Sequence, residues 1–302
     1  MCFLIFITDF VSDSVFLYNY LKRRKSMKSM KKYLFVAVLV LIVAVGIGSC
    51  AAGWFDFGSS GSGNSTNDNV SGEINLAAAA SLKNVYDEKL IPMFEKQHPG
   101  VKVVPTYASS GDLQTQIENG LKADIFMSAA NKQMNKLADE GFVDNKTNKQ
   151  FLENKVVLIV PANSTSNISS FDDLKNVSGH IAIGDPESVP AGQYAKEVLT
   201  NLGTWDSVQS KLSLGTDVTA VLNQVAQGSA DCGIVYSTDA KSNKDVKVVC
   251  EAPAGSLNTS VIYPVAELKN TTNKEGADAF MDFLQTKEAK DVFVEYGFTI
   301  HK

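Results

Sequence analysis

Helix N-termini and hydroxyl side chains are the groups with which this chain could do chemistry, and that chemistry is anion binding. The clearest case is Ile181–Leu199, where an apolar run breaks at Gly184 and a polar loop leads into a helical pattern opening at Ala191. The first backbone N–H groups of a helix have no intrahelical acceptor and carry the positive end of its dipole. The sequence therefore predicts a site for a negatively charged group at this loop.

The same arrangement of strand, loop and helix recurs along the chain. Strands are predicted at Glu73–Ala79, Val101–Tyr107, Ala123–Ala129, Val156–Pro161, Ile181–Ile183, Lys211–Leu214, Asp231–Tyr236, Val246–Val249 and Val261–Val265. Strands that alternate with helices indicate an α/β chain with mostly parallel sheets. Ligands in such sheets bind where strands end and helices begin. The candidate site loops are therefore those of Ser81, Ser109 and Ser110, Pro190–Gly192, Asp217 and Val218, and Tyr236.

Taken singly, each candidate residue also has an ordinary structural explanation. Ser81 and Ser110 could be helix caps, and Tyr236 could be a partly buried core residue. Ala191 and Val218 have no polar side chain at all. A hydrolase that used either serine would need a base, yet the chain has no G-x-S-x-G motif and no histidine near these serines in sequence. The prediction of a binding site therefore rests on the five loops as a set.

Length and composition narrow the class of protein. The 302 residues allow roughly two domains, the net charge is −5, and acidic and basic residues are mixed along the predicted folded body. Nucleic acid is therefore not an expected partner. The four cysteines form no CxxC pair and have no neighbouring histidine, so no zinc pattern is present. Cys232 and Cys250 could either form a disulfide or remain free thiols.

The N-terminal region has the pattern of an export signal. Lysines after Met27 precede an apolar stretch at residues 33–48, and Ile47–Cys50 resembles the lipobox at which prokaryotic lipoproteins are cleaved and lipidated. An uncleaved membrane anchor is the alternative, and both place the remaining chain outside the cytoplasmic membrane. Residues 1–26 do not fit this pattern, so we expect translation to start at Met27 or Met30.

The predicted organisation before the folded body has two parts. Residues 1–49 comprise the N-terminal extension and the lipoprotein-type signal segment. Residues 50–72 comprise the lipidated Cys50 and a tether rich in Gly, Ser and Asn. A lipid, a tether and a globular body together predict a protein held at the extracytoplasmic face of the membrane.

Seven sequence words resemble the extracytoplasmic molybdate-binding proteins of ABC transporters. They are AAAASLKNVYDE (77–88), YASSGDLQTQI (107–117), ADIFMSA (123–129), GDPESVPAGQYAKEVL (184–199), DVTAVLNQV (217–225), GIVYSTDA (233–240) and YGFTI (296–300). They occur in the order and at spacings similar to those of that family, and they extend over nearly all of residues 73–302.

The resemblance implies a two-lobed α/β fold of the periplasmic-binding-protein type, with hinge strands between the lobes and the ligand in the cleft. Lobe 1 would comprise residues 73–154 and 262–302, and lobe 2 residues 155–261, with hinges near 154–156 and 259–263. The ligand would be molybdate, whose molybdenum is held as the oxyanion through Ser81 and Ser110 of lobe 1 and Ala191, Val218 and Tyr236 of lobe 2. No catalytic residue and no cofactor are implied. The implied partners are the permease subunits of an importer, and the protein is expected to be a monomer.

The chemistry of these five positions suits a dianion that has acceptor oxygens and no proton near neutral pH. All five are uncharged, and neutral donors can bind such an ion once water is excluded. Tungstate should bind like molybdate, whereas the smaller sulfate should leave gaps between donors and oxygens. Some archaeal relatives complete a six-coordinate metal with carboxylates. No Glu occupies the position of Val218, so tetrahedral coordination is expected. The alternatives are a binder of another oxyanion such as sulfate, or a sensor module with the same fold.

Overall fold

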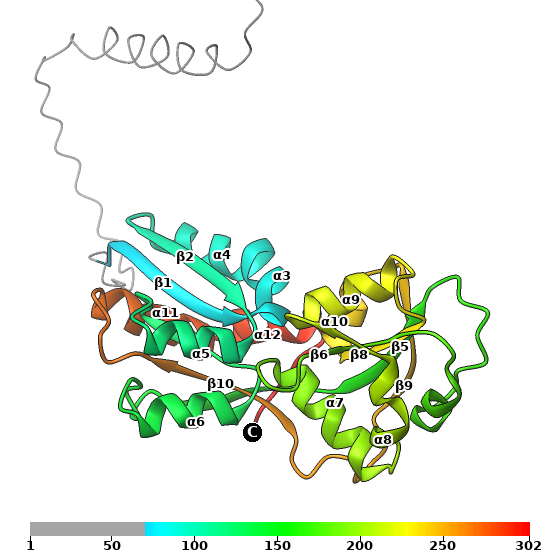
Figure 1. The fold of residues 1–302 in the computed structure, drawn as a ribbon. Helices are drawn as coiled ribbons and strands as arrows, with labels where there is room; N and C mark the ends of the chain where they lie inside the picture. The colour runs from blue at the N-terminus through cyan, green and yellow to red at the C-terminus, as the bar shows by residue number, and fades with distance from the viewer. Residues whose placement is uncertain (1–69) are drawn as a thin grey trace, which may run out of the picture. The chain divides into compact units, whose positions relative to one another are not determined.

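The computed structural model describes residues 70–302, which belong to one compact unit of the chain. The predicted N-terminal extension, the signal segment, Cys50 and most of the tether lie outside the described residues. Within residues 70–302, no helix combines the length and the apolar character that crossing a membrane requires. The description that follows concerns this unit alone (Figure 1).

The first sheet has six strands in the order β11-β4-β10-β3-β1-β2. Their bounds are β1 Gly72–Ala79, β2 Val101–Ala108, β3 Ile125–Met127, β4 Lys149–Asn154, β10 Val261–Glu267 and β11 Thr299–Ile300. β1 runs parallel to both β2 and β3, whereas β10 and β11 pair antiparallel with their neighbours. The centre of the sheet is strongly apolar, as in the β1 segment from Leu76 to Ala79.

The second sheet has five strands in the order β7-β6-β8-β5-β9. Their bounds are β5 Val156–Pro161, β6 Ile181–Gly184, β7 Leu212–Gly215, β8 Cys232–Tyr236 and β9 Val246–Glu251. β6 is parallel to β7 and β8, and β5 pairs antiparallel with β8 and β9. Cys232 and Cys250 lie in β8 and β9, which flank β5, and both are free thiols. Burial raises the pKa of Cys232 to about 12.

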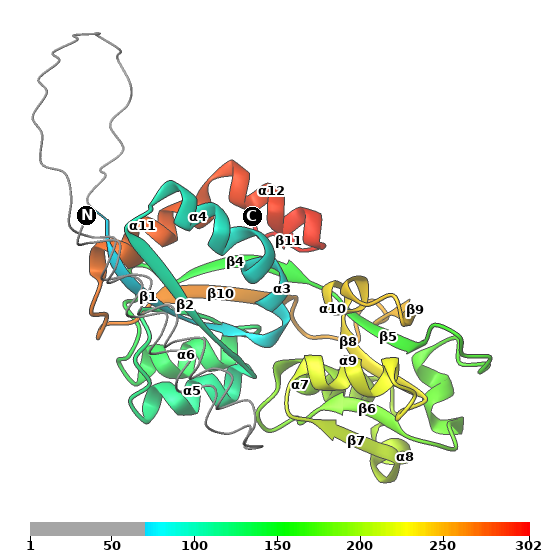
Figure 2. The same ribbon diagram turned by 90° about the horizontal axis from the view of Figure 1, so that it is seen from above.

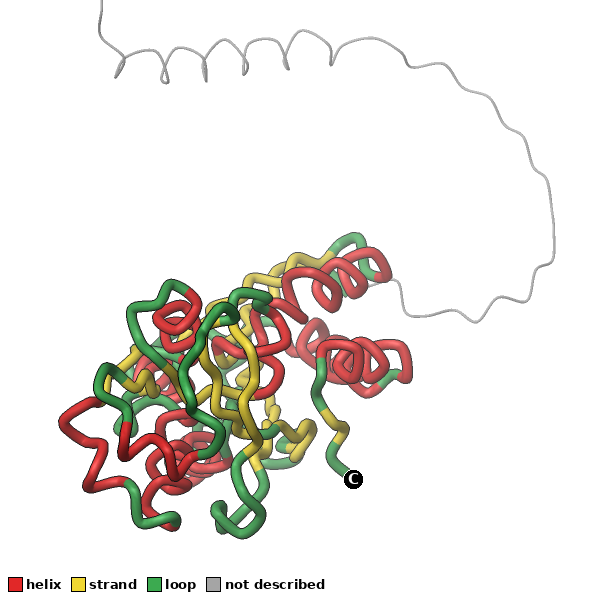
Figure 3. The backbone as a smooth tube through the Cα atoms, turned by 90° about the vertical axis from the view of Figure 1, so that its right-hand side faces the viewer, coloured by secondary structure: helices red, strands yellow, loops and turns green. Residues whose placement is uncertain are grey.

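Helices cover both faces of each sheet. The first sheet is covered by η1 Ala80–Leu82, α3 Lys83–Val85, η2 Tyr86–Leu90, α4 Ile91–Gln97, α5 Ser110–Glu118, α6 Asn131–Asp139, α11 Lys274–Gln285 and α12 Lys287–Tyr296. The second is covered by η3 Phe171–Asn176, α7 Pro190–Asn201, α8 Trp205–Val208, η4 Gln209–Lys211, α9 Val218–Ala226 and α10 Ser237–Ser242. Figure 3 shows the strands with helices on either side.

The strand order explains why the helices divide between the two faces. From β1 the chain steps outward to β2 and then back past β1 to β3, and from β6 it steps to β7 and back to β8. Right-handed crossovers in opposite directions place successive helices on opposite faces. Figure 2 accordingly shows α4 and α5 on opposite sides of the first sheet. In each sheet, the carboxyl ends of the parallel strands lie at the same edge. The loops at that edge lead to helices on opposite faces of the sheet.

The α/β prediction is confirmed, but its detail of mostly parallel sheets is wrong, because both sheets are mixed. The strands that run against the parallel set are β10 and β11 in the first sheet and β5 in the second, whereas β4 and β9 run with it. Only Lys155 separates β4 from β5, and residues 252–260 join β9 to β10. A strand that leaves one sheet for the other ends at the edge where the parallel strands end, so β4 and β9 run with them. A strand that enters its sheet at that edge has to run against them, as β5 and β10 do. β4 itself was not predicted, because its sequence KQFLEN has no sustained apolar run.

Candidate functional site

The loops after β1, β2, β6, β7 and β8 converge on one small cavity. All five sequence-predicted residues line it, together with residues that include Ala79, Ser109, Val189, Pro190 and Asp217. The lining therefore comes from both sheets, at the carboxyl ends of their parallel strands. This is the position at which α/β sheets bind ligands.

Ser81 lies in the short turn that follows β1, and its side chain makes no helix-capping hydrogen bond. Its Oγ instead lies 2.9 Å from the hydroxyl of Tyr263 in β10. The helix-cap explanation therefore does not account for this serine. The bond to Tyr263 leaves Ser81 with hydrogen-bonding capacity toward the cavity.

Ser110 is the first residue of α5, and the residue before it does the capping. The Oγ of Ser109 accepts from the N–H of Asp112 at 3.1 Å, whereas the Oγ of Ser110 accepts from the N–H of Ala129 at 2.9 Å. Ser110 is fully buried. Because an N–H can only donate, the hydroxyl proton of Ser110 remains available to an acceptor in the cavity.

Ala191 and Val218 occupy the first turns of α7 and α9, so their N–H groups have no intrahelical acceptor. The N-cap of α9 is Asp217, whose carboxylate accepts from the N–H of Ala220 at 2.8 Å. The start of α7 packs directly on the end of β6. A Cβ on Gly192 would lie 2.0 Å from the carbonyl oxygen of Gly184, so only glycine allows this approach.

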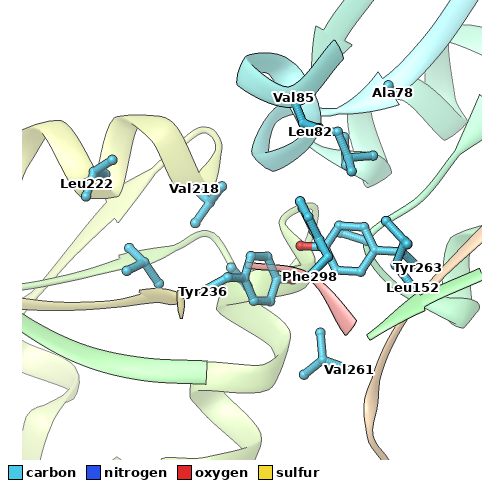
Figure 4. Packing of buried hydrophobic residues seen from close by; sticks show 14 of the residues in the cluster. Ala78, Leu82, Val85, Leu152, Val218, Leu222, Tyr236, Val261, Tyr263 and Phe298 are labelled. Carbon is cyan, nitrogen blue, oxygen red and sulfur yellow. The ribbon is translucent and has the colours of Figure 1, made fainter. Parts of the chain in front are cut away.

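Tyr236 ends β8 and is 1% exposed. Its hydroxyl has no hydrogen-bond partner within residues 70–302. Burial raises its pKa well above the ordinary value, so the hydroxyl keeps its proton. Leaving a buried donor unpaired costs about 1–3 kcal/mol, and a bound acceptor in the cavity would remove that cost. Figure 4 shows Tyr236 beside Tyr263, between the helix that carries Val218 and the turn that carries Leu82.

The electrostatics of the cavity depend on neutral groups. Its lining contains no Lys, Arg or His, and its one charged residue, Asp217, is bonded to its own helix. No group of three or more potential metal-ligating side chains occurs in the described part of the chain. The favourable field for an anion must therefore come from the N-termini of α5, α7 and α9 and from hydroxyl dipoles.

Two hydrogen bonds connect the walls of the cavity directly. The N–H of Gly111 in α5 donates to the carbonyl oxygen of Ser188 at 2.9 Å. The Nε2 of Gln133 in α6 donates to the Oε1 of Gln193 in α7 at 3.3 Å. These contacts lie beside the cavity, and each joins a segment of the first sheet's layer to a segment of the second.

Sequence reasoning missed Tyr263 and Asn154, which lie immediately behind the cavity. Tyr263 contacts Ser81, and Asn154 contacts Tyr263 in turn. Both occupy strand positions, where an aromatic or an amide residue carries no signal of its own. Only their long-range contacts reveal them.

Comparison with known proteins decides the family. The model of the family described as "Bacterial extracellular solute-binding protein" matches residues 74–299. The chain belongs to this family. The family consists of extracellular solute-binding proteins, which places this chain outside the cytoplasm.

Individual relatives cover most of the chain. YvgL of Bacillus subtilis, which is named as an ABC transporter substrate-binding lipoprotein, is 39% identical over 89% of this chain and 98% of its own length. The molybdate-binding protein ModA of Escherichia coli is 41% identical over 76% of this chain and 90% of its own length. The solved periplasmic molybdate-binding protein of Azotobacter vinelandii is 25% identical, with a TM-score of 0.68, over 76% of this chain and all of its own. The two-lobed fold of this family member is thereby confirmed.

Proposed function

We propose that this chain binds molybdate outside the cytoplasmic membrane and delivers it to an ABC importer. The single observation that carries the proposal is the buried Tyr236 hydroxyl, which lines the cavity and has no hydrogen-bond partner within the described residues. The molybdate-binding relatives named above support the choice of ion.

The proposed ligand set is Ser81, Ser110, Ala191, Val218 and Tyr236, three hydroxyls and two backbone N–H groups. Each can offer a proton, and the Oγ of Ser110 already accepts from Ala129. Molybdate offers acceptors alone, so donors and acceptors match in kind. Hydrogen bonds to a charged group are about twice as strong as neutral ones. Tungstate, a tetrahedral dianion with the same acceptor oxygens, should bind in the same way.

The proposed lobes are residues 73–154 with 262–302, and residues 155–261. The two sheets support this division, because the chain leaves the first sheet after Asn154 and rejoins it at Val261. Ion capture would then bring the Ser81 and Ser110 loops against the Ala191 and Val218 helices. The contact between Gly111 and Ser188 would form in the same movement.

The finer details of location and partners are also proposals. The lipobox-like Ile47–Cys50 and the similarity to YvgL support a lipid anchor on Cys50. The anchor and the Gly/Ser-rich tether would hold the body near the permease subunits of the importer. The protein would act as a monomer.

Isothermal titration calorimetry of the purified full chain in mild detergent tests the proposal. Molybdate and tungstate should bind with one-to-one stoichiometry and similar affinity, and sulfate should bind much more weakly. Equal or tighter binding of sulfate would replace molybdate with another oxyanion. Absence of binding by all three would refute oxyanion binding altogether.

A further inference from the structure

A buried chain of hydrogen bonds leads from Ser81 to the crossing between the two sheets. The hydroxyl of Tyr263 lies 2.9 Å from Ser81 Oγ and 3.2 Å from Asn154 Nδ2. Tyr263 is fully buried, and Asn154 is 9% exposed. Asn154 ends β4, one residue before the chain enters the second sheet. Of the three residues Ser81, Tyr263 and Asn154, only Ser81 lines the cavity.

The orientation of the Asn154 amide follows from its neighbours. The backbone N–H of Lys155 lies 2.8 Å from the amide atom assigned as Oδ1. A backbone N–H cannot accept a hydrogen bond, so that atom has to be the oxygen. The hydroxyl of Ser237 donates to the same oxygen at 3.0 Å. The amide nitrogen therefore faces Thr238 Oγ1 at 2.9 Å and the hydroxyl of Tyr263.

The direction of the remaining bonds is then determined step by step. An amide nitrogen only donates, so the oxygen of Tyr263 accepts from Asn154. Tyr263 has one proton left, and its other hydrogen-bond partner is Ser81 Oγ. Either hydroxyl could donate in this bond, but if Ser81 donated, the buried proton of Tyr263 would have no other acceptor in its hydrogen bonds to the described residues, which is unfavourable for a buried donor. With Tyr263 as the donor, the proton of Ser81 itself remains free to point into the cavity. Burial raises the pKa of Tyr263 well above its ordinary value, so this proton is retained.

We propose that Tyr263 and Asn154 are positioning residues that hold the Ser81 hydroxyl as a donor toward the oxyanion. The inference rests on the proposed function. A free hydroxyl samples three staggered orientations and can accept as well as donate. A hydroxyl oxygen turned toward a dianion without protons would repel it. With Ser81 already accepting from Tyr263, the donor is oriented before the ion arrives, which is the benefit of preorganisation.

The side-chain amide of Asn154 also connects the Ser81 hydroxyl to the other wall of the cavity. Ser237 and Thr238, which bond to Asn154, directly follow the cavity residue Tyr236. Ser81, Tyr263 and Asn154 all belong to the layer of the first sheet, whereas Ser237 and Thr238 open α10 beside the second. The orientation of Ser81 is therefore set within one lobe. The hydroxyls of Ser237 and Thr238 in α10 provide the remaining hydrogen bonds of the Asn154 side-chain amide.

A double-mutant cycle on the full-length protein, titrated with molybdate by calorimetry, tests this role. Ser81→Ala should weaken binding about tenfold or more, since it removes a hydrogen bond to a charged group. Tyr263→Phe should weaken binding about three- to tenfold, because Ser81 regains its three orientations and loses a polarising partner. In the Ser81→Ala background, Tyr263→Phe should cause no further loss. Two residues that act through one bond are non-additive in this way.

Tyr296→Phe is the matched control, because it removes a tyrosine hydroxyl that donates to Glu88 at 2.6 Å, away from the cavity. It should leave molybdate affinity unchanged, and the melting temperature of each ion-free variant confirms folding. Losses that add in the double variant, or a Tyr263→Phe protein that binds like wild type, would overturn the positioning role and leave the proposed function intact. A wild-type protein that binds none of molybdate, tungstate and sulfate would refute both.

Discussion

Tyr236 provides the sharpest test at the scale of single residues, because its buried hydroxyl has no partner in residues 70–302. Tyr236→Phe should leave the stability of the ion-free protein unchanged or slightly higher, since it removes an unsatisfied group. The same variant should weaken molybdate binding about ten- to hundredfold, the range expected for a hydrogen bond to a charged group. Thermal unfolding without ion and calorimetry with ion measure the two effects.

The control for that substitution is Tyr86→Phe. Tyr86 is equally buried, but its hydroxyl donates to Met127 Sδ at 3.0 Å in the core of the first sheet's layer. This variant should not change affinity. A Tyr236→Phe protein that loses stability and retains full affinity would identify Tyr236 as a core residue only.

Ser110→Ala should reduce both affinity and stability. The change removes a donor to the ion and also leaves the buried N–H of Ala129 without an acceptor, at a cost of about 1–3 kcal/mol. Ser128→Ala separates the two effects. The Oγ of Ser128 donates to the Ala130 carbonyl at 2.7 Å and accepts from the Ala130 N–H, and it does not line the cavity. The control should lose stability alone, and unchanged affinity in Ser110→Ala would remove Ser110 from the site.

At the scale of elements, the approach of α5 to the loop before α7 depends on a residue without a side chain. A Cβ on Gly111 would lie 2.3 Å from the carbonyl oxygen of Ser188, which is closer than real Cβ contacts come. Gly111→Ala should therefore hinder lobe closure and weaken molybdate binding, while the ion-free protein folds normally. Small-angle scattering should show a smaller molybdate-induced decrease in the radius of gyration than in wild type.

Gln116→Ala, at an exposed position of the same helix, is the control for closure. It should bind and close like wild type. If Gly111→Ala closes and binds normally, the contact between Gly111 and Ser188 is not part of the closing movement.

At the scale of the whole molecule, one buried carboxyl makes stability depend on pH. Asp239 is 6% exposed, and burial raises its pKa to about 7, while a hydrogen bond from the Tyr236 N–H lowers it and the charge of Asp217 raises it. Its unfolded pKa is about 3.9. The folded state therefore binds the proton more tightly, and the resulting stabilisation is lost as pH rises through about 7.

Urea unfolding of wild type and Asp239→Asn between pH 5 and 8 measures this effect. The asparagine variant is neutral at every pH, so wild type should lose stability relative to it as pH increases toward about 7. The difference should level off above that value. Curves that stay parallel across this range would show that Asp239 is already ionised in the folded protein.

Sequence alone determined the α/β class and the candidate loops at the strand ends, and the seven words that resemble the molybdate-binding family singled out the five residues that line the cavity. These features depend on local patterns, because apolar runs, helix starts and short motifs are formed by residues that are close together in the sequence. The mixed strand directions, the short β4 and the roles of Tyr263 and Asn154 were decided by tertiary structure. In the hydrogen-bond chain from Asn154 to Ser81, the bonded partners are 109 and 182 positions apart. Such contacts exist only after two distant strands pair, because a hydrogen bond depends on distance in space and not on separation along the chain.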